Sequence, residues 1–490
     1  MHTLEAISAA RNLWLGNGLP VSFLSRLNLS SHPDPAIKSS FKLGTIAQTS
    51  IGLSGLSAAQ FHLLRTGVDQ EVTVDARHAV LEFHSQAWYT LDECLHDGGD
   101  AIVGLYRTKD ESYVRIHTNF PHHRRGILSI LNIPDSPETS RAQVQSAIRT
   151  WNAVDLESQA YANGMCATAL RSFAEWSVHP HAKAVEGVLP VQLIKIGEAP
   201  KREISSKYTR PLDGIRVLDL SRVLAGPVAG RTLAAHGADV LLVTSPRLPA
   251  LPELDADTSR GKRTTQLDLT IPTDHEKLKR LASNADVFLQ AYRPGALASK
   301  GFGPQELAAL HPGIIAASLT AWGWEGPWKD RRGFDSLVQT ASGFNVAEAE
   351  AYAEFTRDAH ELHPRPLPVQ ALDHAAGYLL AFGINAALCK TITEGGSWEV
   401  RVSLAAVSHW IRSFGQLAPE EAFGSMAKPL PLAVLPPDSE IAELSIPWRS
   451  NNGQKMTALK HAAILSCTPV REGESSWAPI SLDAHSAEWL

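Results

Sequence analysis

Asp373 and His374 stand at the start of a long apolar run, "QALDHAAGYLLAFG" at residues 370–383. Helix-forming residues follow Asp373 at once, so the pattern predicts a helix with this carboxylate near its N-terminus. Backbone N–H groups there favour the charged form of a carboxylate. Two interpretations are open. Aspartate is an ordinary helix cap, and an ionised carboxylate is also a nucleophile or a base.

Histidine-rich stretches elsewhere could suggest a metal site. "FPHHRRG" at residues 120–126 has adjacent histidines but neither a partner at helical spacing nor a nearby set of carboxylates. We therefore expect no metal and no tightly bound cofactor.

The composition limits the class of protein. The chain has 490 residues, of which 44% are apolar and 20% are charged, and its net charge is −6. This length suggests two to four globular domains, and no basic stripe favours nucleic acid. The four cysteines form no CxxC pair and indicate reduced thiols. Without a secretory signal or an apolar run of about 18 residues, we expect a cytoplasmic protein that does not enter membranes.

Strands and helices alternate in the second half of the chain. Apolar strands are predicted at 215–220, 238–246, 285–295 and 313–323, with a helix over 226–237 that ends at Gly237. This alternation predicts a parallel sheet that binds ligands beyond the carboxyl ends of its strands. Residues 100–205 differ: they predict a hairpin with a turn at "KDES", a helix over 150–164, and a small α+β domain.

The sequence also contains an internal repeat. Residues 45–66 resemble the run that begins at 369, with Gly52 matching Gly377, an offset of 377 − 52 = 325. After three inserted residues, 70–80 match 398–408 at an offset of 328. At the first offset Asp373 matches Gln48, so only one copy would carry the carboxylate.

Several stretches taken together resemble the class III CoA-transferases, which include formyl-CoA transferase, carnitine CoA-transferase and α-methylacyl-CoA racemase. They are "PLDGIRVLDLSRVLAGPVAGRTLAAHGADVLLV", "RGKRTTQLDL", "ADVFLQAYRPGALASKGFG", "GWEGPWKDRRGFDSLVQTASG" and "LDHAAGYLLAFGINAAL", within about 210–405. Residues 46–205 resemble the later part of the same family, so the family's order is rearranged here.

The resemblance implies an α/β architecture with a Rossmann-like parallel sheet and a smaller α+β domain. We expect four regions: 1–95 completes the large domain, 96–205 is the small domain, 206–412 binds CoA and carries catalysis, and 413–490 is a wrapping tail. The family forms interlocked dimers, which makes a homodimer possible here.

By the same resemblance, Asp373 is the catalytic nucleophile. It would attack an acyl-CoA thioester, form a mixed anhydride and then an aspartyl-CoA thioester, and pass CoA to a small carboxylic acid. Acyl-CoA is thus a substrate. Its phosphates would meet residues at family positions: Arg222, Ala225, Lys262, Arg263 and Arg293.

Four further residues are possible members of the site. Gly98 and Gly99, in "LHDGGDAIVG" at 95–104, stand where the family has a glycine-rich loop that closes over the aspartate. Asp335 follows Phe334, which occupies the position of the racemases' histidine base. His374 adjoins Asp373, although neighbours at a helix start point different ways.

Two other functions stay open. An acyl-CoA racemase or epimerase would use the same scaffold. It needs a base at the position of Phe334, however, and phenylalanine cannot exchange a proton. A non-catalytic acyl-CoA-binding protein would explain the rearranged order.

Overall fold

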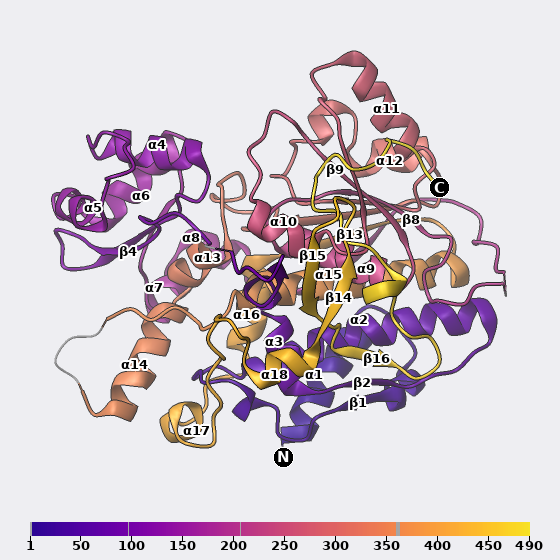
Figure 1. The fold of residues 1–490 in the computed structure, drawn as a ribbon, viewed down its shortest axis with the longest axis horizontal. Helices are drawn as coiled ribbons and strands as arrows, with labels where there is room; N and C mark the ends of the chain where they lie inside the picture. Colours follow the sequence, from indigo (N-terminus) through magenta and orange to yellow (C-terminus); the bar gives the residue numbers. More distant parts are fainter. Residues whose placement is uncertain (1, 97, 206, 359–362) are drawn as a thin grey trace.

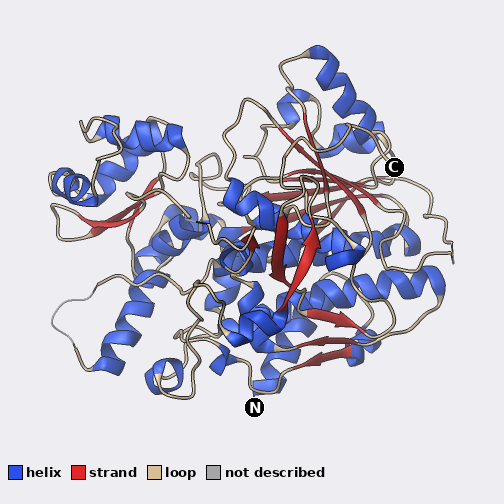
Figure 2. Ribbon diagram, viewed as in Figure 1, coloured by secondary structure: helices blue, strands red, loops and turns tan. Residues whose placement is uncertain are grey.

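The computed structural model describes residues 2–96, 98–205, 207–358 and 363–490. A seven-stranded sheet lies at its centre, in the order β10-β9-β8-β11-β12-β13-β7 (Figures 1 and 2). The first six strands run parallel and only β7 is antiparallel. The strands are β7 Gln192–Gly197, β8 Arg216–Leu220, β9 Asp239–Thr244, β10 Arg263–Gln266, β11 Val287–Gln290, β12 Ile315–Thr320 and β13 Ser397–Ser403. The four strands and the α/β fold class predicted from sequence are confirmed.

Helices cover both faces of this sheet. Successive strand residues point to opposite faces, so Val217 joins one core with α9 (Ala225–Ala235) and α15 (Ala371–Thr393). Leu218 joins a second core with α11 (Pro272–Ala282) and α12 (Pro304–Leu310). By length and composition α15 could cross a membrane, but 89% of its apolar window is buried inside the fold.

The two repeat copies pack against each other through their long helices, α2 (Leu43–Thr66) and α15. The structure corrects their register. The two helices start at residues 43 and 371, and the following helices, α3 (Ala76–Glu82) and α16 (Leu404–Arg412), start at 76 and 404. Both differences are 328, so one offset aligns the copies throughout. Asp373 then corresponds to Thr45, because 373 − 328 = 45, and not to Gln48.

A small α+β unit lies apart from the large sheet, at the upper left of Figure 1. Its antiparallel sheet is β4 (Gly104–Arg107), β5 (Tyr113–Ile116) and β6 (Ala167–Ala169), and it packs on α4 (Pro121–Ile130), α5 (Arg141–Ile148) and α6 (Ala153–Ala162). The hairpin and the helix predicted within 150–164 are both present.

The C-terminal segment runs back over the earlier elements. β14 (Ser445–Arg449) and β15 (Lys455–Leu459) pair with β3 (Thr90–Leu91), while β16 (Ala463–Leu465) pairs with β2 (Val72–Val74), the neighbour of β1 (Leu27–Leu29). Further on, His485 N–H donates to the Thr264 carbonyl on edge strand β10 at 2.9 Å. The segment therefore covers an otherwise open sheet edge.

Candidate active site

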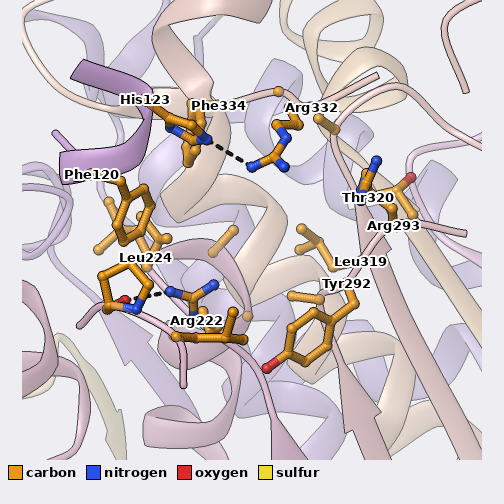
Figure 3. A pocket seen from close by; sticks show the side chains of 18 of the residues that line it. Phe120, His123, Arg222, Leu224, Tyr292, Arg293, Leu319, Thr320, Arg332 and Phe334 are labelled. Atoms are coloured by element: carbon orange, nitrogen blue, oxygen red, sulfur yellow. Dashed lines mark hydrogen bonds between the residues drawn. The ribbon is translucent and has the colours of Figure 1, made fainter. Parts of the chain in front are cut away.

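A cavity of about 800 Å³ opens beyond the carboxyl ends of β8, β9, β11 and β12 (Figure 3). Ligands of open parallel sheets bind at this edge. The start of α4, in the small α+β unit, forms the opposite wall, so the cavity lies between the two parts of the chain. Its lining is Phe120, Pro121, His122, His123, Arg125, Arg222, Val223, Leu224, Ala225, Gly226, Pro246, Arg247, Leu248, Pro249, Ala291, Tyr292, Arg293, Leu319, Thr320, Ala321, Arg332, Gly333, Phe334, Asp373 and Leu404.

The loop between β8 and α9 is built to bind an anion. Val223 has φ +72°, a strained value for a β-branched residue. The loop then leads into α9 at Ala225, and no side chain caps that helix. Its first backbone N–H groups therefore stand at the cavity wall, where a phosphate oxygen would satisfy them.

Three of the five predicted CoA-binding residues line the cavity: Arg222, Ala225 and Arg293. Arg222 is held in place by a 2.5 Å hydrogen bond to the Pro249 carbonyl, and its guanidinium lies 5.1 Å from the centre of the Phe120 ring. Arg222 thus spans from the large sheet to the small unit (Figure 3).

The other two, Lys262 and Arg263, do not line the cavity. Lys262 is fully buried, and its Nζ donates to Asp219 Oδ2 at 2.8 Å and to the Pro227 carbonyl at 2.9 Å. Arg263 forms a two-pronged pair with Asp239, with both distances 2.9 Å. Carboxylates on β8 and β9 already satisfy both cations, so the structure gives them a structural role in place of the predicted phosphate contact.

Asp373 lines the cavity as the third residue of α15, with 7% of its surface exposed. It is not the helix cap. Asp335, at the start of α13 (Asp335–Ala341), caps α15 instead, because its Oδ2 accepts the backbone N–H groups of Leu372 at 2.8 Å and of Asp373 at 3.0 Å. Asp335 is buried and is absent from the cavity lining. The capping interpretation therefore applies to Asp335, and within the described residues the carboxylate of Asp373 has no hydrogen bond or ion pair.

The pKa of Asp373 differs from the expectation that a helix N-terminus would favour the charged form of this carboxylate. Burial raises the pKa of Asp373 well above its usual range, and the nearby charge of Asp335 raises it further. Burial also raises the pKa of Asp335 to about 6, although its hydrogen bonds oppose that shift. The two N–H groups stabilise a negative charge on Asp335. When the pair of carboxyl groups carries a single proton, that proton is therefore on Asp373. The helix terminus therefore does not by itself keep Asp373 ionised.

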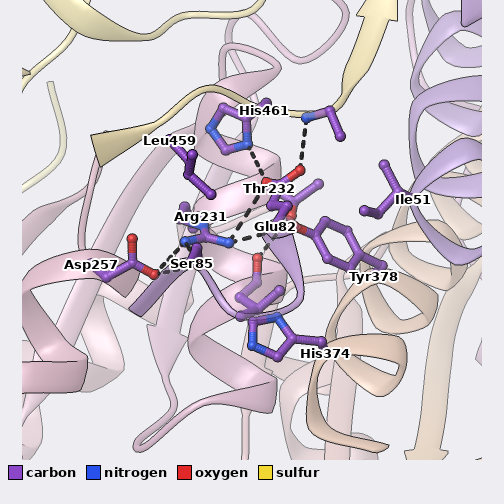
Figure 4. A network of polar contacts seen from close by, with 12 residues as sticks. Ile51, Glu82, Ser85, Arg231, Thr232, Asp257, His374, Tyr378, Leu459 and His461 are labelled. Atoms are coloured by element: carbon purple, nitrogen blue, oxygen red, sulfur yellow. Dashed lines mark hydrogen bonds and ion pairs between the residues drawn. The ribbon is translucent and has the colours of Figure 1, made fainter. Parts of the chain in front are cut away.

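The remaining predicted residues lie outside the cavity lining. Gly98 and Gly99 belong to a turn near Asn119, and residue 97 of that expected loop is outside the described residues. His374 is fully buried on the other side of α15, where its ring stacks on Phe83 at 5.3 Å and its Nε2 lies 3.2 Å from Gln86 Oε1. Figure 4 shows it beside a buried polar network. His374 is therefore a core residue.

Sequence reasoning missed many of the cavity residues, among them Arg332, His122 and His123. Arg332 Nη1 donates to His123 Nε2 at 2.8 Å and to His122 Nε2 at 3.2 Å. Burial, His122 and Arg332 lower the pKa of His123 to about 3, so its ring is a neutral acceptor. As a pattern, "FPHHRRG" suggests only a metal. Arg332 could have been predicted from its position in the sequence, because it lies three residues before Asp335, which was already a candidate site residue.

Comparison with known proteins agrees with this geometry. Residues 212–425 match CoA-transferase family III. This region is a class III CoA-transferase domain. It holds Asp373 and all the cavity residues outside α4 and its approach, and the family recognised from sequence is confirmed.

Curated relatives of the class III CoA-transferase domain carry related names. A Mycobacterium tuberculosis protein named probable fatty acyl-CoA transferase Rv3272 is 35% identical over 42% of this chain and 53% of its own length. An acetyl-coenzyme A transferase of Hypoxylon pulicicidum is 29% identical over 64% and 55%. An acyl-CoA transferase of Gibberella moniliformis is 26% identical over 79% and 73%. The chain spans about half the length of the first two.

Proposed function

We propose that this protein is a CoA-transferase that moves CoA from an acyl-CoA to a carboxylic acid, with Asp373 as the nucleophile. The observation that carries the proposal is the chemical contrast within the cavity. Among the described lining residues Asp373 is the only carboxylate, and five arginines line the same space: Arg125, Arg222, Arg247, Arg293 and Arg332. This is a site for a polyanion that carries a group open to attack by a carboxylate.

The arginines and the start of α9 would hold the phosphates of CoA. Arg222 and the free N–H groups of α9 share one wall, and Arg293 follows the adjacent strand β11. This placement lets the pantetheine arm lie in the cavity with its thioester at Asp373.

The reaction then proceeds by balanced exchanges. An Asp373 carboxylate oxygen attacks the thioester carbonyl, the C–S bond breaks, and CoA leaves as a thiolate. The thiolate attacks the aspartyl carbonyl of the mixed anhydride and releases the donor acid. The acceptor carboxylate attacks the aspartyl-CoA thioester, the C–S bond breaks, and CoA leaves as a thiolate from a second mixed anhydride. The thiolate attacks the acceptor's acyl carbonyl in that anhydride, and the bond to the Asp373 oxygen breaks. Asp373 returns as a carboxylate, and no oxidant or reductant is required.

The racemase alternative has less support. A racemase needs a second proton-exchanging group, and Phe334 fills the position of the racemases' histidine. Its ring stacks on that of His117 at 3.7 Å and 3°. Burial lowers the pKa of His117 to about 3, and His117 is not part of the cavity lining, so this ring does not supply the missing base.

Trapping of the acyl-enzyme tests the proposal. The full chain is incubated with a pool of short acyl-CoAs and quenched with hydroxylamine, and the peptide that contains Asp373 is weighed. We expect a hydroxamate at Asp373, and none in an Asp373→Asn variant that still binds CoA. Absence of the adduct with every donor would favour the non-catalytic acyl-CoA binder.

A further inference from the structure

Arg332 occupies a place in the cavity that differs from that of the other cations. It lies on the segment between β12 and α13, two residues before Phe334 and three before Asp335, the residue that holds the backbone of Asp373. Three residues of extended chain span at most about 11 Å. In Figure 3, Arg332 and Arg222 stand at opposite sides of the cavity. Arg332 is thus close along the chain to the residue that holds the backbone of Asp373, and it lies across the cavity from Arg222.

The charge of Arg332 is not neutralised within the described chain. No carboxylate there pairs with Arg332, and its buried Nε has no hydrogen-bond partner. Its neighbour Arg331 differs: it lies 3.9 Å from Glu157 Oε2 and packs on the rings of Trp328 and Tyr161. A half-buried, unpaired guanidinium in a cavity attracts an anion from the ligand.

The two histidines orient this guanidinium. Burial and the charge of Arg332 lower the pKa of His122, and the pKa of His123 is shifted in the same direction, so both rings accept from Nη1 as neutral groups. They fix the direction of the planar fork without cancelling its charge. The N–H groups of Nη2 have no partner within the described chain, so they can donate charge-assisted hydrogen bonds to a carboxylate.

Apolar side chains also line the cavity. Phe120, Phe334, Leu319, Ala321 and Leu404 all contribute to the lining. A methylene chain suits these walls, and a charged end group suits Arg332.

We propose that Arg332, oriented by His122 and His123, binds a carboxylate at the far end of the substrate's acyl chain. The site would therefore take dicarboxylic acids and their mono-CoA thioesters. This inference rests on the proposed function, because it places the reacting thioester at Asp373. Arg332 is a specificity-determining residue here and takes no part in bond making.

Binding of two matched thioesters tests this inference. Succinyl-CoA and butyryl-CoA have the same chain length and differ by a carboxylate in place of a methyl group. Their Kd values are measured by calorimetry on the full chain carrying Asp373→Asn, which removes the nucleophile and hence turnover. We expect at least tenfold tighter binding of succinyl-CoA, loss of this preference in Arg332→Gln, and partial recovery in Arg332→Lys. Arg332→Gln should change the Kd of butyryl-CoA less than threefold.

Arg125→Gln is the matched control, because Arg125 is an exposed arginine of the same lining. It should keep the ratio of the two Kd values. Equal weakening of both thioesters by Arg332→Gln would place Arg332 on the CoA moiety and overturn the inference. Lack of a preference in the starting chain, or of any binding, would overturn it too. The hydroxylamine experiment is independent: a missing adduct together with an Arg332-dependent preference refutes the transferase proposal alone.

Discussion

At the scale of single residues, the site depends on two neighbouring carboxyl groups with separate roles. Asp335 holds the start of α15 and Asp373 faces the cavity. The arrangement recurs in the other repeat copy, where Asp34 Oδ1 accepts the backbone N–H of Thr45 at 2.9 Å. Each copy therefore has a capping aspartate, but only the second copy has a carboxylate on the helix itself. This contrast is the strongest structural argument that Asp373 serves chemistry.

Asp335→Asn should shift the acid limb of the pH dependence of acylation to lower pH. The nucleophile must be ionised, so acylation rises with pH through the pKa of Asp373. Burial raises that pKa first and the charge of Asp335 raises it further. Asparagine keeps an oxygen for the helix N–H groups but removes the charge, so the acid limb should move to lower pH. The measurement is the rate of hydroxamate formation against pH. Asp34→Asn is the control and should leave the limb in place; an unmoved limb in Asp335→Asn would contradict the argument.

Asp373→Asn should stabilise the fold at neutral pH. A carboxyl group whose pKa is raised on folding binds more protons in the native state, so its contribution to stability falls as pH rises above the unfolded value of about 4. The amide variant escapes this loss. Its Tm should exceed that of the starting chain at pH 8, and the difference should shrink towards pH 4. Scanning calorimetry at both values checks this, and a difference that grows on acidification would show the sign to be wrong.

The sequence predicted some of these residues and not others for a physical reason. Position after a strand places Arg222 and Arg293 at the ligand edge of a parallel sheet, and both line the cavity. The same reasoning fails for Lys262, because its partner Asp219 comes from β8, 43 residues earlier. A short sequence pattern can show that a lysine or arginine lies near the edge of the sheet. It cannot show which carboxylate pairs with that cation, because the order of the strands in the sheet determines the pair.

At the scale of elements, the close contact between α15 and α9 positions the cavity. A Cβ on Gly377 would lie 2.6 Å from the Ala225 carbonyl oxygen and 2.9 Å from Val228 Cβ. Only glycine lets α15 approach the start of α9 this closely, so the position of the loop between β8 and α9 depends on it.

Gly377→Ala should therefore reduce both stability and ligand affinity. Overpacking of this kind costs about 1–3 kcal/mol, and the shift of α9 should weaken CoA binding. Gly52→Ala in α2 is the control, because its Cβ would meet side-chain ends and no backbone: those of Leu27, Leu29 and Val74, at 3.0, 3.2 and 3.7 Å. Urea unfolding and CoA titration of both variants make the measurement. Equal effects of the two substitutions would contradict the positioning role of Gly377.

The sequence predicts the strands and helices better than it predicts the register between the two repeat copies. Continuous apolar runs indicate the parallel strands, because both faces of that sheet are buried. The predicted register of the repeat is wrong because α2 and α15 are rich in small apolar residues throughout, so several offsets match nearly as well. The helix starts, which fix the offset at 328, depend on Asp34 and Asp335, and both lie outside the compared runs.

At the scale of the whole molecule, a buried charge network joins three distant parts of the chain (Figure 4). Arg231 on α9 lies 2.6 Å from Asp257 Oδ2 of α10 (Pro252–Thr258) and 3.7 Å from Glu82 Oε1 of α3. Glu82 in turn lies 3.1 Å from His461 Nδ1 in the C-terminal segment. No local pattern could predict these contacts, since their members are up to 379 residues apart. The network ties the first repeat copy and the C-terminal segment to the seven-stranded sheet within one chain, while a homodimer stays a prediction.

Arg231→Met tests whether this network unites the fold. Methionine approximates the volume of arginine but leaves Glu82 and Asp257 buried without their shared cation, and breaking a buried pair in this way costs about 3–5 kcal/mol. Arg26→Met is the matched control, because Arg26 and Asp69 form a solvent-exposed pair, whose contribution to stability is small when water screens it. Urea unfolding should show the larger loss for Arg231→Met. If α3 and the C-terminal segment depend on this arginine for their attachment, that variant should also lose the single cooperative transition. A cost no larger than that of Arg26→Met would mean that apolar packing alone holds these parts together, and that the buried charges only satisfy one another.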